Sequence, residues 1–236
     1  MNGLFVAGTD TGVGKTVLTA GITCALRSRG HAVGVCKPVQ SGALTADPYG
    51  DAMLLKRWTR VAESPGEIAP ISFAAALAPL VAAELEGRSV DRAEAIAHVR
   101  AVVARYDAVL VEGAGGVFVP VGDDWTIADL AVDLGLPVLV VARAGLGTVN
   151  HSTLTVRAVR ELGLEVAGVV LNGKQDESTA TNARLIERVA NVPVLGRTPT
   201  LEGELTGERL RALVEDNVDV DALVGVAIRS REVAHV

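Results

Sequence analysis

Residues 4–16 read LFVAGTDTGVGKT, a short apolar run that breaks into a glycine-rich turn. A buried strand that leads into such a turn lets backbone N–H groups point at phosphate oxygens, and the following helix adds its positive end. In this pattern Lys15 reaches the β- and γ-phosphates and the Thr16 hydroxyl contacts Mg²⁺. The usual spacing is G-x-x-x-x-G-K-[ST], whereas here Thr9 replaces the first glycine and Gly8 lies one residue earlier. Such a turn can also be a hairpin or a simple helix start, but its setting favours a bound nucleoside triphosphate.

The composition predicts one α/β domain over residues 1–236, because 49% hydrophobic content supplies a large core. The formal net charge of −6, with no stripe of Lys and Arg, argues against nucleic acid as a partner. The N-terminus has no signal-peptide pattern, and no apolar run reaches membrane-spanning length. We therefore expect a cytoplasmic protein that does not associate with membranes.

Cysteine and lysine usage adds two expectations. Cys24 and Cys36 stand in apolar contexts without a metal-ligand spacing, which predicts buried free thiols. The chain has 22 basic residues, and only those at 15, 37, 56 and 174 are lysines. A lysine in the phosphate loop and another before Pro38 suggest sites that need a compact ammonium group.

Apolar strands alternate with helical patterns along most of the chain. We predict strands over 4–7, 32–36, 108–111, 138–142, 166–171 and 192–195, with helices over 15–29, 126–134, 149–162, 179–189 and 207–214. Between 72 and 103 we expect an Ala-rich helix broken by Pro79 and a second helix after Asp91, and an amphipathic stretch follows Asp219. Strands that are apolar throughout and separated by helices indicate a doubly wound, mainly parallel sheet with helices on both faces.

Three further candidates follow from where the strands end, since ligands gather at the carboxyl ends of parallel strands. The segment from Lys37 to Ser41 follows the second strand and should lie near the phosphate loop, although an exposed lysine in an ordinary loop is the alternative. Glu112 ends the strand over 108–111 before a glycine-rich loop, where P-loop proteins place the acid that holds Mg²⁺; a solvated glutamate is the alternative. Asp51 begins a predicted helix and is either a second metal ligand or an N-cap.

Asn172 ends the strand over 166–171, and its amide suits the edge of adenine, while a turn-forming asparagine is the alternative. The guanine-type order N-K-x-D is absent, because Gly173 follows Asn172 and Lys174 comes one place late. The sequence therefore favours adenine as the base.

Four segments in this order, 8–16, 37–42, 112–116 and 147–151, closely resemble the dethiobiotin synthetase family. The resemblance runs from residue 1 to about 201, with no clear match after Leu201. It implies ATP- and Mg²⁺-dependent carboxylation and ring closure of 7,8-diaminononanoate with CO₂, giving dethiobiotin, ADP and phosphate. A carbamate and a carbamic-phosphoric anhydride would be the intermediates, and positioned cations would stabilise the transferring phosphoryl group.

The resemblance also implies a role for each matching residue. The catalytic cations would be Lys37 and Lys15. Thr11 and Ser41 would hold the carbamate region, and Thr16, Asp51 and Glu112 would gather Mg²⁺. Contacts to the nucleotide would come from Gly12, Val13, Gly14, Lys15, Thr16, Val17, Asp51, Glu112, Gly113, Ala114, Gly115, Asn172, Gly173, Pro199, Thr200 and Leu201. Family members can carry tryptophan where Thr200 stands, so this chain departs from the pattern there.

Gly147, Thr148 and Asn150 open the helix over 149–162, where N–H groups suit a carboxylate. In the family this clamp comes from the second subunit, so the resemblance implies a homodimer with shared sites. Thr148 or Asn150 as a plain helix cap is the alternative.

Two other classes have related loops. Partner-switching ATPases of the partition and division-site type carry K-G-G-x-G-K-T, but Asp10 occupies the place of that first lysine, and the stretch after Asp219 is mixed in charge. Amide-forming synthetases of the cobyrinate type need a glutaminase partner for ammonia, and no nucleophilic Cys motif is present. Both remain alternatives to the ligase interpretation.

Overall fold

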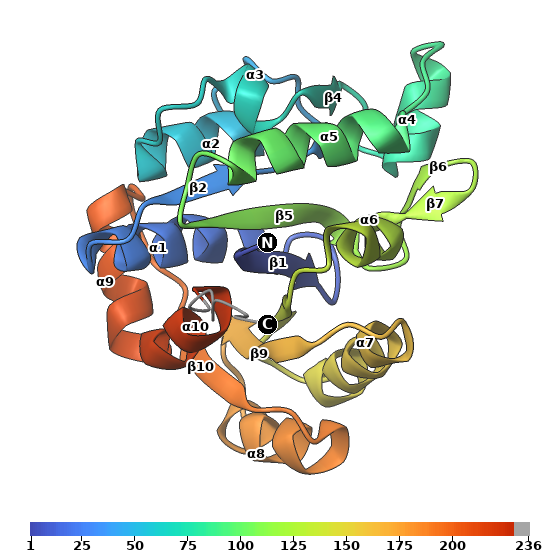
Figure 1. Ribbon diagram of the computed structural model, residues 1–236. Coiled ribbons are helices and arrows are strands. Elements are labelled where there is room, and N and C mark those ends of the chain that lie inside the picture. Colours follow the sequence, from blue (N-terminus) through green and yellow to red (C-terminus); the bar gives the residue numbers. More distant parts are fainter. Residues whose placement is uncertain (229–236) are drawn as a thin grey trace, which may run out of the picture.

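A six-stranded parallel sheet with strand order β10-β9-β8-β1-β5-β2 forms the centre of the molecule (Figure 1). The structure is a computed structural model, and it describes residues 1–228. The strands of this sheet are β1 (Gly3–Gly8), β2 (Val33–Cys36), β5 (Ala108–Gly116), β8 (Val138–Arg143), β9 (Val166–Asn172) and β10 (Val194–Thr198). Two small sheets pair β3 (Val39–Ser41) with β4 (Ile71–Phe73), and β6 (Pro120–Gly122) with β7 (Trp125–Thr126).

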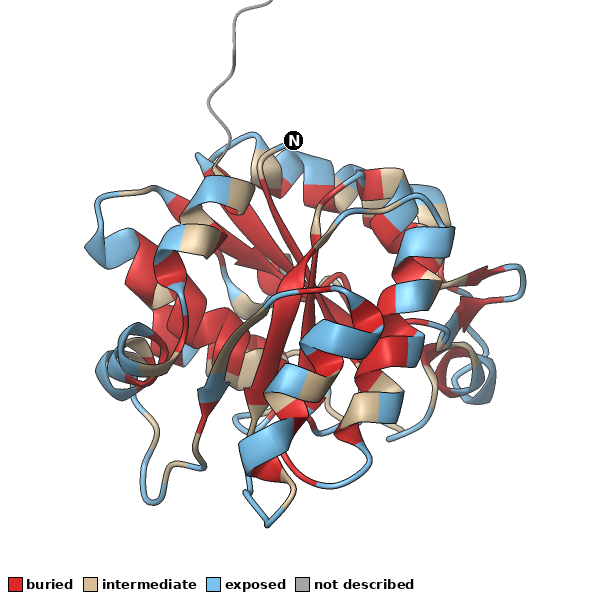
Figure 2. Cartoon of the chain, turned by 90° about the horizontal axis from the view of Figure 1, so that it is seen from below, coloured by how far each residue is buried: buried red, intermediate tan, exposed pale blue. Residues whose placement is uncertain are grey.

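Helices cover both faces of the sheet, as the apolar strands predict. The helices are α1 (Lys15–Ser28), α2 (Asp51–Thr59), α3 (Pro65–Ile68), α4 (Pro79–Leu85), α5 (Arg92–Val103), α6 (Ile127–Leu134), α7 (Thr148–Glu161), α8 (Thr179–Ala190), α9 (Gly207–Asn217) and α10 (Val220–Ala227). Leu4 and Val6 of β1 pack in one core cluster with α1, α9 and α10, whereas Phe5 and Ala7 pack in the other with α5 to α8. The strands β1 and β2 are correspondingly buried along their length, whereas the edge strand β10 is mostly half-buried (Figure 2).

The chain order places a topological switch point at β1, which lies between β5 and β8. From β1 the chain crosses past β5 to β2, and the later strands β8, β9 and β10 extend the sheet on the other side. Ligands bind outside the carboxyl ends of strands at such a point. The loops after β1, β2 and β5 therefore meet where a nucleotide site is expected.

Most predicted elements are confirmed, with shifts of a few residues at their ends. Pro79 does not break a helix: it is the first residue of α4, where its missing N–H has no partner to lose. The last strand begins at Val194 and ends at Thr198, later than predicted, because Pro193 has no N–H to give to a ladder. The strands β3, β4, β6 and β7, each two or three residues long, and the four-residue α3 were not predicted.

Cys36 is buried as predicted, whereas Cys24 is only half-buried, and both thiols are free. The amphipathic stretch after Asp219 begins as α10, and residues 229–236 of it lie outside the described residues. Within residues 1–228 no helix combines the length and the apolar character needed to cross a membrane.

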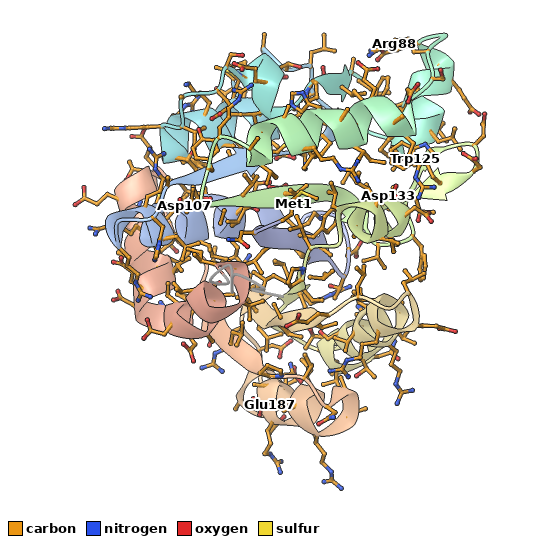
Figure 3. The ribbon with its side chains drawn as sticks, viewed as in Figure 1. Met1, Arg88, Asp107, Trp125, Asp133 and Glu187 are labelled. Carbon is orange, nitrogen blue, oxygen red and sulfur yellow. The ribbon has the colours of Figure 1, made fainter. Side chains whose placement is uncertain are left out.

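Ion pairs and hydrogen bonds tie the outer elements to the sheet. Asp107, labelled with Asp133 in Figure 3, accepts a hydrogen bond from the N–H of Ala32 at 2.9 Å and so joins the start of β2 to the start of β5. Asp133 of α6 pairs with Arg92 of α5 at 2.6 Å. The first contact holds β2, the edge strand that leads to Lys37, beside β5, and the second joins α5 to α6.

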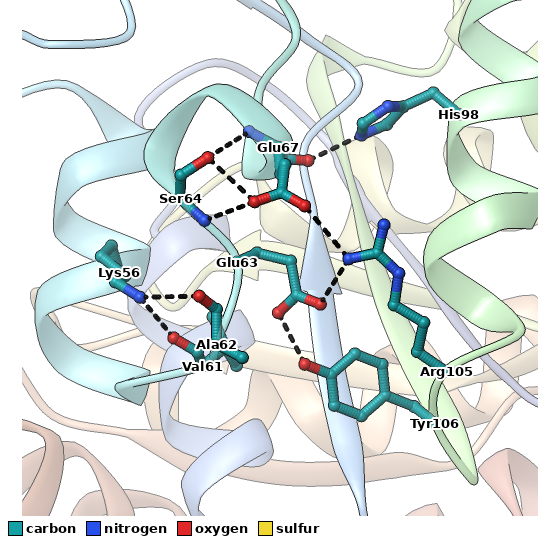
Figure 4. Close-up of polar contacts among 9 residues, drawn as sticks. All are labelled: Lys56, Val61, Ala62, Glu63, Ser64, Glu67, His98, Arg105 and Tyr106. Carbon is teal, nitrogen blue, oxygen red and sulfur yellow. Dashed lines mark hydrogen bonds and ion pairs between the residues drawn. The ribbon is translucent and has the colours of Figure 1, made fainter.

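A buried carboxylate anchors the segment between α2 and α3 (Figure 4). Glu63 is 2% exposed, and its Oε2 accepts a hydrogen bond from the Tyr106 hydroxyl at 2.6 Å. Burial, together with this contact to Glu63, raises the pKa of Tyr106 to about 12. The ring of Tyr106 lies over Gly34 of β2, where a Cβ would fall 2.5 Å from it.

Tyr106→Phe should lower the free energy of unfolding by about 1–3 kcal/mol, because it removes a hydrogen bond from a buried carboxylate. Urea unfolding measures this change. Tyr49→Phe is the matched control, since Tyr49 is 84% exposed and should leave stability unchanged. Equal stability of the two variants would show that Glu63 does not depend on this hydroxyl.

Candidate active site

The loop between β1 and α1 has the backbone of a phosphate-binding loop. Gly14 precedes α1 in a left-handed conformation with φ 96°, and Gly12 has φ 73°. The N–H of Thr9 is fixed to the Val141 carbonyl at 3.0 Å, so the neighbouring strand β8 holds the start of the loop. At Gly8 a Cβ would fall 2.7 Å from Lys15 Nζ. The displaced first glycine of the motif therefore makes room for the lysine.

Gly14→Ala should weaken ATP binding by at least about tenfold, since a left-handed backbone alone costs a side chain about 1–3 kcal/mol. In addition, the new Cβ would lie 2.0 Å from Asn172 Nδ2, so the loop must move away from its phosphate-binding shape. Equilibrium dialysis with labelled ATP measures the change. Gly30→Ala is the control, because Gly30 also has a positive φ of 91° but nothing within 4 Å of the new Cβ. If the two variants bind ATP equally well, the loop geometry is not what holds the phosphates.

Lys15 lies at the base of this loop with 6% of its surface exposed. Its Nζ donates a hydrogen bond to the Asp10 carbonyl at 3.1 Å. Burial, and then the charge of Lys37, lower the pKa of Lys15 to about 8. The charged form of Lys15 is therefore poorly stabilised by its surroundings, and an anion beside it would stabilise it strongly.

A second lysine lies between two carboxylates. Lys37 Nζ is 2.8 Å from Glu112 Oε1 and 2.9 Å from Asp51 Oδ2. Lys37 is 4% exposed and Glu112 1%, so the exposed-loop and solvated-glutamate alternatives are wrong. Burial alone would lower the pKa of Lys37, but the two carboxylates together raise it above its ordinary value. The same ammonium outweighs burial at Asp51 and lowers its pKa.

Thr16 completes this group. Its hydroxyl lies 3.0 Å from Asp51 Oδ1 and 2.9 Å from Glu112 Oε1, and its single proton can serve only one of them at a time. Asp51 does not cap α2: Gly50 is the N-cap, and the Asp51 carboxylate turns toward Thr16 and Lys37. The capping alternative is therefore wrong.

The three oxygen-bearing side chains fit a magnesium ion. Within residues 1–228, Glu112 Oε2 is buried without a hydrogen-bond partner. No group of three or more His, Cys, Asp or Glu suited to a metal occurs in the same range. Mg²⁺ commonly takes only one or two carboxylates and completes its shell with phosphate oxygens and water. A hydroxyl, two carboxylates and a free carboxylate oxygen beside a phosphate loop match that preference.

These groups line a cavity of about 580 Å³. It brings together most of the predicted site: Thr11, Gly12, Gly14, Lys15, Thr16, Val17, Lys37, Ser41, Asp51, Glu112, Ala114 and Gly115. Its remaining wall is apolar and was not predicted: Leu54, Trp58, Ala76, Leu77, Ala78, Pro79 and Val119. The Ala-Pro-Leu segment around Pro79 carried the only sequence signal for that wall, and it was assigned to a helix interior.

Gln40 is a further residue that the sequence did not single out. It is 1% exposed, its Oε1 accepts the N–H of Ala52 at 2.8 Å, and its Nε2 donates to the Ala43 carbonyl at 2.9 Å. It thereby caps α2 in place of Asp51 and leaves that carboxylate free to face the site. Its position inside the Lys37–Gly42 segment was the available signal.

Asn172 lies on the other side of the phosphate loop. Its Nδ2 donates to the Val13 carbonyl at 2.8 Å, and its Oδ1 accepts from the Thr198 hydroxyl at 2.7 Å. Asn172 and Gly173 line a separate cavity with Gly12 and Val13. One amide proton of Asn172 remains for a ligand.

The Pro199–Leu201 segment does not line either of these two cavities. Leu201 instead packs against the core cluster that contains Trp58. The predicted contacts of this segment, like those of Asn172, remain predictions.

The start of α7 lies outside the first cavity. Gly147, with φ 89°, is the N-cap of α7 and makes no side-chain cap, Thr148 is fully buried, and Asn150 is exposed. The capping alternative for Thr148 and Asn150 is therefore wrong. The cavity that Lys37 lines does not include Gly147, Thr148 or Asn150.

Fold and loop together define a P-loop NTPase. MinD, a cell division protein of Aquifex aeolicus, superposes with a TM-score of 0.55 at 17% identity, covering 96% of this chain and 95% of that one. A ParA family ATPase from Chlorobium tepidum gives 0.51 at 14%, covering 98% and 95%. At these identities the likeness concerns the fold alone. Asp10, which stands at the first position of the switch-ATPase loop pattern, lies 3.6 Å from Arg143.

Sequence relatives narrow the class further. A family profile described as "AAA domain" matches residues 2–209. The ATP-dependent dethiobiotin synthetase of Bacillus licheniformis is 41% identical over 227 residues, covering 95% of this chain and 96% of the relative. That of Bacillus velezensis is 38% identical over 234 residues, covering 98% and 100%. The chain belongs to the ATP-dependent dethiobiotin synthetase family of ligases, and the match extends well past Leu201, where the sequence motifs end.

Proposed function

We propose that this enzyme closes the ureido ring of dethiobiotin from 7,8-diaminononanoate, CO₂ and ATP. One substrate amine adds to CO₂ and loses a proton, giving a carbamate. A carbamate oxygen attacks the γ-phosphorus and releases ADP, which leaves a carbamic-phosphoric anhydride. The second amine then attacks the carbonyl carbon and expels phosphate as the ring closes.

One observation supports this proposal most strongly: two buried lysines, Lys15 and Lys37, line one cavity beside the phosphate loop. Every intermediate of the sequence is anionic, so fixed ammonium groups stabilise charge as the phosphoryl group moves. Thr11 and Ser41 line the same cavity and would hold the carbamate. These residues would promote the reaction chiefly by holding the carbamate and the phosphates in position to react.

Thr16, Asp51 and Glu112 would hold Mg²⁺. When bound, the metal supplies positive charge to the phosphate oxygens of the nucleotide. The P-loop segment 12–17 would hold the phosphates, with 112–115, Asn172, Gly173 and 199–201 as further nucleotide contacts.

The carboxylate of the diamine substrate would bind at the start of α7 of a second subunit. Such an interface would cover the exposed side chains Phe118, Leu146 and Leu154, at 62%, 78% and 58%. Leu154 and Phe118 line one shallow cavity with Thr11 of the phosphate loop, so this surface adjoins the site. The homodimer and a cytoplasmic location belong to the same proposal.

Phosphate release from MgATP and bicarbonate, measured with and without 7,8-diaminononanoate while mass spectrometry follows dethiobiotin, tests the function. We expect release that depends strictly on the diamine and a product of the mass of dethiobiotin. Slow release that ignores the diamine would overturn the proposal in favour of a switch ATPase. Release that requires ammonia and another acid would favour an amide-forming synthetase.

A further inference from the structure

Lys37 holds the two carboxylates of the site together. Its ammonium bridges Glu112 Oε1 and Asp51 Oδ2 at 2.8 and 2.9 Å, and Asp51 and Glu112 also share the Thr16 hydroxyl. No other Lys or Arg within residues 1–228 forms an ion pair with either carboxylate. Without Lys37 the two carboxylates, one of them fully buried, would keep only the more distant charge of Lys15 as compensation, which is a costly arrangement.

The same carboxylates are the groups that suit a divalent cation. An ammonium and a dication cannot both sit against one pair of carboxylates without strong repulsion, since a buried site screens charge poorly. Glu112 Oε2 accepts no hydrogen bond within residues 1–228 and so remains a carboxylate oxygen that Lys37 does not occupy. Lys37 itself has somewhere to go, because it lines the cavity that Thr11 and Ser41 also line, and its four-carbon stem is flexible.

We propose that Lys37 and the divalent metal exchange at the Asp51–Glu112 pair. Before the metal arrives, the ammonium takes its place and keeps the carboxylates in position. The metal displaces the ammonium from the carboxylates and frees it to face the substrate in the cavity. This inference rests on the proposed metal site, and it adds that the lysine needed for the reaction is held inactive until the metal is bound.

The exchange can be tested without turnover, because removing the competing Lys37 ammonium should strengthen binding of the divalent metal. Nucleotide-free Lys37→Met protein should bind Mn²⁺ at least about tenfold more tightly than wild type in titrations followed by electron paramagnetic resonance, tenfold being an ordinary coupling between competing sites. Lys37→Arg keeps the charge and should stay near the wild-type affinity. Lys56→Met is the matched control, since Lys56 lies on the same helix as Asp51 but donates to the carbonyls of Val61 and Ala62. It should bind Mn²⁺ as wild type does.

The melting temperature with and without Mn²⁺ provides a second test of the exchange. Lys37→Met should melt lower than wild type without metal and gain more from added Mn²⁺, because the stabilisation by a ligand rises with the logarithm of its affinity. Should Lys37→Met fail to fold, Lys37→Gln replaces it, with the same expectation. An unchanged or weaker affinity for Mn²⁺ in these uncharged variants overturns the exchange.

A double variant, Lys37→Met with Glu112→Gln, tests whether the exchange or the proposed metal site has failed. The tight Mn²⁺ binding should disappear in the double variant. If Mn²⁺ binds ATP-loaded enzyme equally with and without Glu112→Gln, the metal site itself is wrong. If that binding depends on Glu112 but Lys37→Met gains no affinity, only the exchange is wrong.

Discussion

Lys37→Ala will lower diamine-dependent phosphate release by about 10²- to 10³-fold, the loss typical of one preorganised charge-stabilising donor. The ammonium is 4% exposed, so water cannot take over its role without entering the site. The affinity for ATP without a divalent metal should change little, because the loop glycines, Lys15 and Thr16 remain. Coupled phosphate assays give the first quantity, and equilibrium dialysis with ATP gives the second.

Lys56→Ala is the control for this loss. Lys56 also lies in a partly buried setting, where it donates to two backbone carbonyls, but it is absent from the cavity lining. Its removal should leave turnover within about twofold of wild type, since it touches none of the reacting groups. Near wild-type turnover by Lys37→Ala would remove Lys37 from the mechanism, whereas a matching loss of ATP binding would make it a nucleotide contact.

The sequence was most informative where local backbone rules and strand order determine the structure. The loop before Lys15 needs glycines for its left-handed residues, and apolar runs before that loop and before Glu112 mark strands whose carboxyl ends must meet. These features predicted the sheet and the convergence of Lys15, Lys37 and Glu112 before any coordinates.

The sequence was least informative where a side chain had equal reasons to turn in two directions. Asp51 at a helix start is an equally good cap or ligand, and the decision depends on tertiary contacts: Gln40 takes the N–H of Ala52, while Thr16 and Lys37 contact the Asp51 carboxylate. The burial of Glu63 was likewise hidden, because its partner Tyr106 lies 43 residues away. Long-range pairs of this kind leave no local pattern in one sequence.

The start of α7 distinguishes a site built by one subunit from a site shared between two subunits. The cavity that Lys37 lines does not include Asn150, so we expect a contact of Asn150 with a substrate in that cavity to come from a second copy. Asn150→Ala alone should raise the KM for 7,8-diaminononanoate, because it weakens substrate binding rather than phosphoryl transfer. An unchanged KM would show that Asn150 of α7 does not bind the substrate carboxylate.

Mixing Lys37→Ala with Asn150→Ala subunits should restore activity that neither variant has at a low diamine concentration. In a heterodimer with shared sites, one site carries both lesions and the other carries none. Random reassortment makes about half of the dimers mixed, and each has one intact site of two, so about a quarter of wild-type activity should return.

Differently tagged subunits and tandem purification would provide the heterodimer itself, in which activity should reach about half of wild type. A mixture of Lys37→Ala with Glu112→Gln is the control: both lesions fall on the same side of the site, so every site in their heterodimer is damaged and nothing should return. Proven Lys37→Ala/Asn150→Ala heterodimers without activity would mean that each subunit builds its site alone, and the exposed Leu146 and Leu154 would then need another partner.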